Sequence, residues 1–156
     1  MAAYKLIPFE PEHALRLELQ HQTPFEYEMV WDEAPWHRVR EEGIAWTVTV
    51  DDEIAFTMGV VRIWPGRALA WFMGDESLGS GTWMHRTSVM LRATRMATRM
   101  LDEVQDDPEY RRIEASVRED YKQGHQWARM LGFELEGLMR CYDQQGNNHA
   151  MYARVI

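Results

Sequence analysis

The chain has 156 residues, 46% of them hydrophobic, with seven Trp and eleven Met. This length and composition predict one packed domain with its own core, and they argue against a disordered chain. The formal net charge of −8 argues against nucleic acid as the main partner, because phosphate binding depends on clustered Lys and Arg.

The cysteine count and the hydropathy pattern exclude further classes of protein. One cysteine, Cys141, excludes an intramolecular disulfide and fits a reducing compartment. It falls in an expected strand, which predicts that it packs rather than reacts. The sequence has no apolar run near the ~20 residues of a membrane helix and no signal-peptide pattern at its N-terminus. We therefore expect a soluble protein without a membrane partner.

The N-terminal third is predicted to contain a strand and two helices. Tyr4 to Phe9 is an apolar stretch that suits an opening strand, and Pro11 suits the first position of a helix. Thr23-Pro24 is a credible cap for the second helix, which runs through the aromatic and acidic residues 25–36. Gly43 is expected to end that helix.

Three strands are predicted to follow as a meander. Asp51-Asp52 and Pro65-Gly66 provide the turns between them. Gly59 interrupts the middle strand, which predicts either a bulge or a close approach of another backbone. The three strands are expected at Ile44 to Val50, Ile54 to Ile63 and Ala68 to Met73, rich in β-branched and aromatic residues.

A loop from Gly74 to Trp83 then leads into a long helix that ends near Val104. Its apolar residues recur at three- and four-residue spacing and define one face. Arg92, Arg95 and Arg99 share another face. That face is either simply solvated or a basic edge for an acidic partner or a cofactor phosphate.

The last third reads as strand, helix, strand, turn and strand. Gly132 lies just past the last helical residue, where a positive φ is required. Asp143 to Asn148 indicates a hairpin turn rather than a calcium site. The expected elements are a strand at Ile113 to Val117, a helix at Gly124 to Leu131, a strand at Phe133 to Tyr142, a turn at Gly146-Asn147 and a strand at His149 to Val155.

Several enzyme chemistries are excluded by the motifs. The six histidines show no zinc-ligand spacing, so no metal site is predicted. The sequence contains neither the G-x-S-x-G elbow of the hydrolases nor the phosphate-binding G-x-x-x-x-G-K-[ST] loop.

Two phrases carry a resemblance to a known family. Met130-Leu131-Gly132-Phe133, with Glu136-Gly137 and Arg140 after it, resembles the C-terminal half of the GNAT (general N-acetyltransferase) family, in the branch that modifies protein N-termini and antibiotics. Ile63 to Trp71 resembles a strand pair in GNAT-like proteins of short-tailed bacteriophages. The resemblance implies one α+β domain over residues 1–156, with a mostly antiparallel sheet of about seven strands and helices on both faces.

The resemblance also implies acetyl-CoA as cofactor, held between the fourth and fifth strands at Met73 and Val117. A glycine-rich loop and a helix N-terminus would hold its pyrophosphate. The loop at residues 78–83 is a half-match, because Leu78 stands where the family has Arg and Trp83 where it has a small residue. His85 and Arg86 could supply the lost charge. The cofactor-binding residues implied are Met73, Gly74, Gly79, Ser80, Gly81, Thr82, Trp83, Tyr121 and Trp127.

The catalytic assignment is less direct. The family's acid tyrosine falls on Ala128, and its turn asparagine falls on Tyr121, so Tyr121 is the candidate for a displaced acid. Glu76, His85 and Glu114 are candidate bases. The aromatic residues 25–36 correspond to the part that lines the acceptor site in the family, or else they pack on the sheet.

Two functions therefore remain open. The first is an acyl-CoA-dependent N-acetyltransferase that transfers an acetyl group to an amine in the host cytoplasm. The second is a GNAT-fold bacteriophage protein that has lost catalysis and serves as a virion or interaction component with protein partners. A homo-oligomer is compatible with either.

Overall fold

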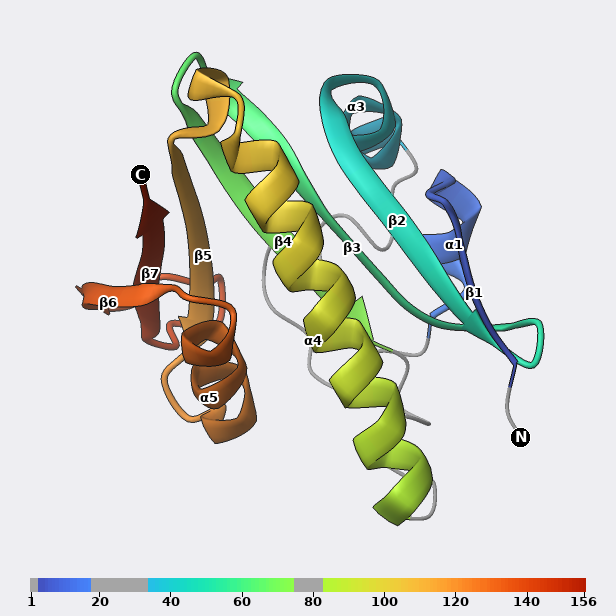
Figure 1. Ribbon diagram of the computed structural model, residues 1–156. Coiled ribbons are helices and arrows are strands. Elements are labelled where there is room, and N and C mark those ends of the chain that lie inside the picture. The colour runs from blue at the N-terminus through green and yellow to red at the C-terminus, as the bar shows by residue number, and fades with distance from the viewer. Residues whose placement is uncertain (1–2, 18–33, 75–82) are drawn as a thin grey trace. The chain divides into compact units, whose positions relative to one another are not determined.

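The computed structural model describes residues 3–17, 34–74 and 83–156 (Figure 1). The first part of the second expected helix, residues 25–33, lies outside these ranges, and its last part before Gly43 is described. The elements are β1 (Tyr4–Pro8), α1 (Pro11–Leu15), α3 (Ala34–Glu42), β2 (Gly43–Val50), β3 (Glu53–Trp64), β4 (Arg67–Gly74), α4 (Trp83–Gln105), the short 3-10 helix η2 (Pro108–Tyr110), β5 (Arg112–Arg118), α5 (Lys122–Met130), β6 (Glu134–Met139) and β7 (His149–Val155).

The seven strands form one sheet in the hydrogen-bonded order β1-β2-β3-β4-β5-β7-β6. The pairs β1–β2, β2–β3, β5–β7 and β6–β7 are antiparallel, whereas β4 and β5 run parallel. The predicted α+β class and the predicted strand number are confirmed. No helix within the described ranges is long and apolar enough to cross a membrane.

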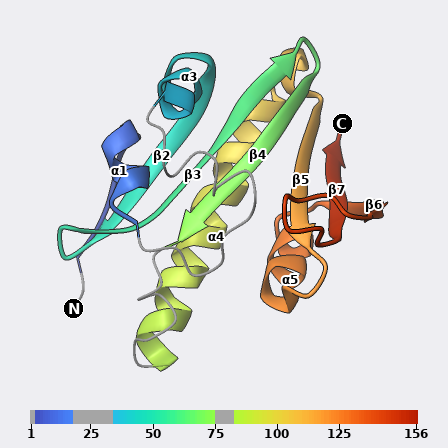
Figure 2. The ribbon, with the colours of Figure 1, turned by 180° about the vertical axis from the view of Figure 1, so that it is seen from behind.

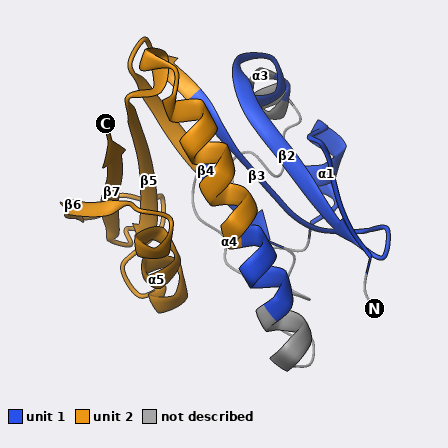
Figure 3. Ribbon diagram, in the orientation of Figure 1, with its two compact units in different colours: residues 1–61, 71–93 blue, residues 62–70, 94–156 orange. Residues whose placement is uncertain are grey.

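The chain falls into two compact units (Figure 3). Unit 1 comprises residues 1–61 and 71–93, and unit 2 comprises residues 62–70 and 94–156. Neither unit is a continuous segment, because β3, β4 and α4 each contribute residues to both.

Unit 1 contains the antiparallel pairs β1–β2 and β2–β3. The helix α3 packs on β2, and Gly43 follows its last residue as expected. The ring of Phe9 meets that of Trp71 edge-on, with 5.3 Å between their centroids. The buried cluster of this unit consists of Phe9, Ala14, Leu17, Val39, Trp71 and Met73.

Gly59 illustrates one of the two alternatives left open by the sequence. A Cβ at this position would lie 2.7 Å from the carbonyl oxygen of Ile44 and 2.9 Å from the ring of Trp71. Glycine is therefore required by a close approach. The bulge of this strand pair lies elsewhere in β3, at Ala55, because Val48 pairs with Phe56 and the next residue, Thr49, pairs with Ile54.

In unit 2, the Pro65-Gly66 turn is tied to the start of β5. Gly66 has φ +89°, and its N–H donates to the carbonyl oxygen of Glu109 at 2.8 Å. Its own carbonyl oxygen accepts from the N–H of Arg112 at 3.1 Å. These bonds fix the point where β4 and β5 begin to pair.

Helix α5 lies on β5 in both views (Figures 1 and 2). It begins at Lys122, two residues before the predicted start at Gly124. Gly124 is not the first residue of the helix. It lies in the first turn, where a side chain would collide with neighbouring residues. A Cβ there would lie 2.6 Å from the ring of Tyr121 and 2.8 Å from Cγ1 of Val117.

Two expectations for the residues after α5 are wrong. β6 ends at Met139 rather than at Tyr142, because Cys141 adopts a positive φ of 49° and leaves the strand. Cys141 is exposed, so the prediction that it packs in a strand fails as well.

The β6–β7 connection is the hairpin turn that was expected. Oδ1 of Asp143 accepts from the backbone N–H of Asn147 at 2.7 Å, and Oδ2 accepts from the Asn147 side chain at 2.8 Å. The same Oδ2 lies 3.3 Å from Nε2 of His149, which is fully buried. The carboxylate oxygens are thus used by the turn itself.

The exit from α5 gives a first prediction. Gly132 has φ +84°, as predicted from its position, so Gly132→Ala places a side chain in a left-handed conformation and should lower the free energy of unfolding by about 1–2 kcal/mol. Gly137→Ala is the matched control, because nothing lies within 4 Å of a Cβ there. Urea unfolding measures both variants, and equal losses would contradict this account of Gly132.

Candidate functional site

The most extensive polar cluster described in unit 2 surrounds Glu114 of β5. Arg67 of β4 donates to both of its carboxylate oxygens, from Nε to Oε1 at 2.9 Å and from Nη2 to Oε2 at 2.6 Å. Arg112 donates from Nε to Oε1 at 2.6 Å. Arg112 also holds Glu136 of β6 with two bonds of 2.9 and 2.6 Å. Four alternating charges thus link three strands.

Register explains why these side chains meet. The parallel pairing of β4 with β5 joins Arg67 to Arg112 and Leu69 to Glu114. Glu114 therefore lies diagonally one step from Arg67 on the same face of the sheet, since side chains alternate along a strand. The guanidinium of Arg67 also stacks on the ring of Trp64, 4.3 Å from its centroid.

Burial and charge determine the ionisation of Glu114. Its side chain is only 7% exposed. Hydrogen bonds from Arg67 in the first place, and from Arg112, lower the pKa of Glu114 below its ordinary value, although burial works in the opposite direction. The bonds to Arg112 likewise lower the pKa of Glu136.

This arrangement bears on Glu114 as a candidate base. A general base needs a pKa near the working pH and a free oxygen within reach of the proton that it removes. Glu114 has a lowered pKa, and both oxygens accept from arginines. The geometry suits an anchor between strands better than a proton acceptor.

Two of the predicted site residues lie on α5. Tyr121 immediately precedes the helix, with its ring against Gly124 in the first turn. The indole N–H of Trp127 donates to the hydroxyl of Thr94 on α4 at 2.9 Å, within unit 2. Trp127 therefore has a structural role, whatever it does towards a ligand.

The remaining predicted residues belong to the β4–α4 segment. Met73 is 1% exposed and packs in the core of unit 1, and Gly74 is the buried last residue of β4. Trp83 and His85 lie in the first turn of α4. Glu76, Gly79, Ser80, Gly81 and Thr82 lie outside the described residues, and so does most of the aromatic segment 25–36.

The sequence reasoning did not find Arg67, Arg112 and Glu136 as partners of Glu114. In the sequence, Arg67 and Glu136 belong to the two phrases that carry the family resemblance. The available signal was charged residues in otherwise apolar strands, Arg67 at the start of β4 and Arg112 and Glu114 in β5. Such residues are rarely buried without a partner, but the partner cannot be named before the register is known.

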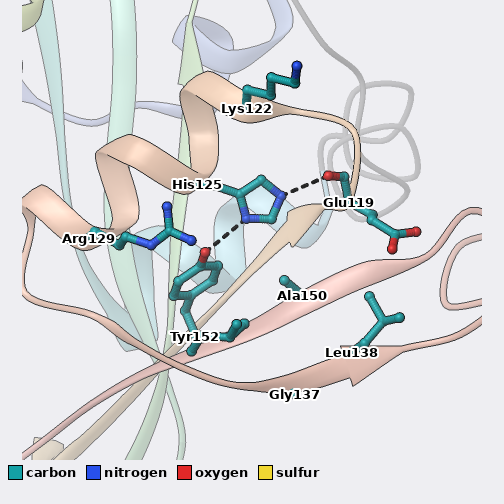
Figure 4. A pocket seen from close by; sticks show the side chains of 9 residues that line it. Glu119, Lys122, His125, Arg129, Gly137, Leu138, Ala150 and Tyr152 are labelled. Atoms are coloured by element: carbon teal, nitrogen blue, oxygen red, sulfur yellow. Dashed lines mark hydrogen bonds between the residues drawn. The ribbon is translucent and has the colours of Figure 1, made fainter.

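A separate pocket of about 460 Å³ lies between α5 and the strands β6 and β7 (Figure 4). Lys122, His125 and Arg129 line it from the helix, and Leu135, Leu138 and Tyr152 line it from the strands. Nδ1 of His125 lies 2.9 Å from the hydroxyl of Tyr152, while Nε2 lies 3.1 and 3.0 Å from the carbonyl oxygens of Arg118 and Glu119. Neither Tyr121 nor Trp127 lines this pocket.

Metal chemistry has no support in the described part of the chain. Its His, Cys, Asp and Glu side chains form no group of three or more that could hold a metal ion.

Comparison with known proteins shows which solved structures have a similar fold. No protein-family model matches the chain, and no curated protein matches it in sequence. Among solved structures, it is similar to the ribosomal-protein-S18-alanine N-acetyltransferase from Escherichia coli, with a TM-score of 0.67, 14% identity, and coverage of 99% of this chain and 94% of that one.

Two further structures agree. An acetyltransferase from Salmonella typhimurium that modifies the N-terminal serine of ribosomal protein L7/L12 matches with a TM-score of 0.64 and 20% identity, over 98% of this chain and 95% of that one. The Microcin C7 self-immunity acetyltransferase, in complex with acetyl-CoA and AMP, matches with a TM-score of 0.65 and 14% identity, over 98% and 92%. The chain has the fold of the GNAT acetyltransferases.

The Glu114 cluster gives a second prediction. Because its pKa is lowered in the folded state, Glu114 contributes stability that is present above its ordinary value of 4.5 and is lost as the pH falls through the folded pKa. Above pH ~5, the free energy of unfolding of Glu114→Gln should therefore be about 1–3 kcal/mol lower than that of the wild type. The difference should shrink steadily below that pH.

Urea unfolding between pH ~3 and ~7 measures this difference. Glu103→Gln, at an exposed position on α4, is the matched control and should leave the pH profile unchanged. Parallel profiles for wild type and Glu114→Gln would contradict the assignment.

Proposed function

We propose that this protein is an acyl-CoA-dependent N-acetyltransferase whose acceptor is the α-amino group of a peptide or protein. The observation that carries the proposal is the match over 97–99% of the chain to several solved N-acetyltransferases, three of which act on ribosomal proteins. One of the matching acetyltransferases holds acetyl-CoA.

The start of α4 fits an anionic cofactor. This helix has 23 residues, and its first turn contains no acidic side chain. The free N–H groups and the positive end of the helix dipole are therefore not compensated from within that turn, which suits a pyrophosphate. Gly79, Ser80, Gly81 and Thr82, which precede the helix, are the residues proposed to contribute further N–H and hydroxyl donors.

Acetyl-CoA supplies an acetyl group activated as a thioester. The amine nitrogen of the acceptor forms the new bond to the acetyl carbon, the bond from that carbon to sulfur breaks, and the amine gives up one proton. The chain has to position the amine, accept that proton and return a proton to the sulfur. We assign the last step to the phenol of Tyr121, and we keep Glu76 and His85 as candidate bases.

The assignment of Tyr121 gives a third prediction. Tyr121→Phe removes only the hydroxyl and keeps the ring that packs on Gly124, so the fold and acetyl-CoA affinity should be retained. The kcat should fall by about 10²-fold, with KM for acetyl-CoA little changed. Tyr110→Phe, in η2, is the matched control.

Release of free thiol from acetyl-CoA measures turnover, with short peptides as acceptors. Peptides with a free N-terminus should be substrates, and the same peptides with a blocked N-terminus should not. Equal rates for Tyr121→Phe and wild type would remove the tyrosine from the mechanism. Absence of thiol release with every amine would leave the alternative of a non-catalytic virion or interaction component.

A further inference from the structure

The pocket beside α5 has one apolar wall, and the bulge in β6 produces it. Leu135 pairs with Tyr152 and Leu138 pairs with Ala150, with a register shift between Leu135 and Gly137. Tyr152 and Ala150 are two residues apart and share a face of the sheet. The shift therefore brings Leu135 and Leu138 to that same face, although they are three residues apart.

Both leucines are exposed although they are apolar. Leu135 is 56% exposed and Leu138 is 51% exposed, and both line the pocket. Exposed apolar side chains that adjoin a cavity mark binding surfaces more often than isolated ones do.

The helical wall of the same pocket is positively charged. Lys122 and Arg129 are seven residues apart, which places them on one face of α5 two turns from each other. Neither side chain has an ion-pair or hydrogen-bond partner in the described part of the chain. Among the described residues that line the pocket, one has a carboxylate, Glu119, which accepts from the side chain of Asn148 at 2.9 Å.

The floor between these walls is made of buried and hydrogen-bonded groups. Tyr152 is fully buried and its hydroxyl is bonded to His125, whose other ring nitrogen faces two carbonyl oxygens (Figure 4). These groups hold α5 to β7 and are not available to a ligand. Recognition must therefore come from the two cations and the two leucines.

β6 is also the last strand of the sheet. Among the described strands it pairs only with β7, so its outer N–H and C=O groups face away from the sheet. Proteins usually protect such an edge with charged side chains. On the pocket face β6 presents leucines instead, and its Glu136 is bound by Arg112.

We propose that this edge docks an extended, acidic segment of a protein partner, which adds to β6 as a further strand. Its apolar side chains cover Leu135 and Leu138, and its carboxylates meet Lys122 and Arg129. A second copy of this chain is the less suitable occupant. Pairing of two β6 strands about a two-fold axis brings the cationic faces of two α5 helices towards each other, which is unfavourable.

The proposal is independent of acetyl transfer and can be tested with designed peptides. The probes are fluorescein-labelled peptides of about eight residues in which Glu alternates with Val, and the same peptides with Lys in place of Glu. Fluorescence anisotropy with the full-length chain measures binding. We expect the Glu peptides to bind at least about tenfold more tightly than the Lys peptides, with an affinity that falls as salt is added.

Variants and a modified peptide assign the contacts. Arg129→Glu and Leu138→Asp should each weaken binding of the Glu peptide at least about tenfold, whereas Arg16→Glu, at the exposed C-cap that follows α1, should change it less than about twofold. Methylation of alternate peptide nitrogens should abolish binding, because it removes the donors that a strand requires.

Four results would overturn the proposal. The Lys peptides could bind as well as the Glu peptides, or methylation could have no effect. Sodium benzoate could displace the peptide at equal concentration, which would indicate a small-anion site. Sedimentation could show a dimer that Leu138→Asp dissociates, which would assign the edge to self-association. Arg129→Glu changes only an exposed side chain, so it remains informative if Leu138→Asp fails to fold.

Discussion

A carboxylate that is 7% exposed would be costly in a sheet if it were not held between two guanidinium groups. Glu114 meets that condition only when Arg67 and Arg112 begin their strands side by side, as the parallel pairing of β4 with β5 places them. The turn at Gly66 secures the same point through its bonds to Glu109 and Arg112. Arg112 then extends the constraint to β6 through Glu136. The organisation of unit 2 depends on this chain of charges.

The same ion pairs explain why several residues of the two family-like phrases are present in the sequence. Gly132 ends α5 with a positive φ, Phe133 is buried, and Glu136 binds Arg112. In the other phrase, Arg67 reaches Glu114. The residues of these phrases therefore hold the C-terminal half together. For that reason the phrases identify a fold and do not by themselves establish an activity. The acetyltransferase proposal depends instead on Tyr121, on the start of α4 and on the whole-chain similarity.

Local rules of the sequence predicted the order of the elements and most of their positions. Glycines at a helix exit and in tight turns, and the alternation of apolar residues, are visible without knowledge of the fold. The predictions were wrong where contacts between residues far apart in the chain determine the local structure. The early start of α5 depends on the packing of Tyr121 and Val117 around Gly124, and the exposed position of Cys141 depends on a backbone conformation that its residue type does not suggest.

The candidate sites were less predictable for the same reason. The partners of Glu114 lie 47 and 2 residues away in the chain, and only the strand register brings them together. The apolar wall of the second pocket depends on a one-residue bulge, without which Leu135 and Leu138 would lie on opposite faces of β6. A sequence pattern with period two cannot reveal such a shift.

Calorimetric titration of the purified chain with acetyl-CoA tests the central claim of an acetyltransferase most directly, with Gly81→Trp as the paired variant. The account predicts one site with a Kd on the order of micromolar, and loss of binding when an indole fills the loop that is proposed to hold the pyrophosphate. Absence of heat at millimolar acetyl-CoA, or equal binding by Gly81→Trp, would contradict the cofactor site on which the proposed function rests.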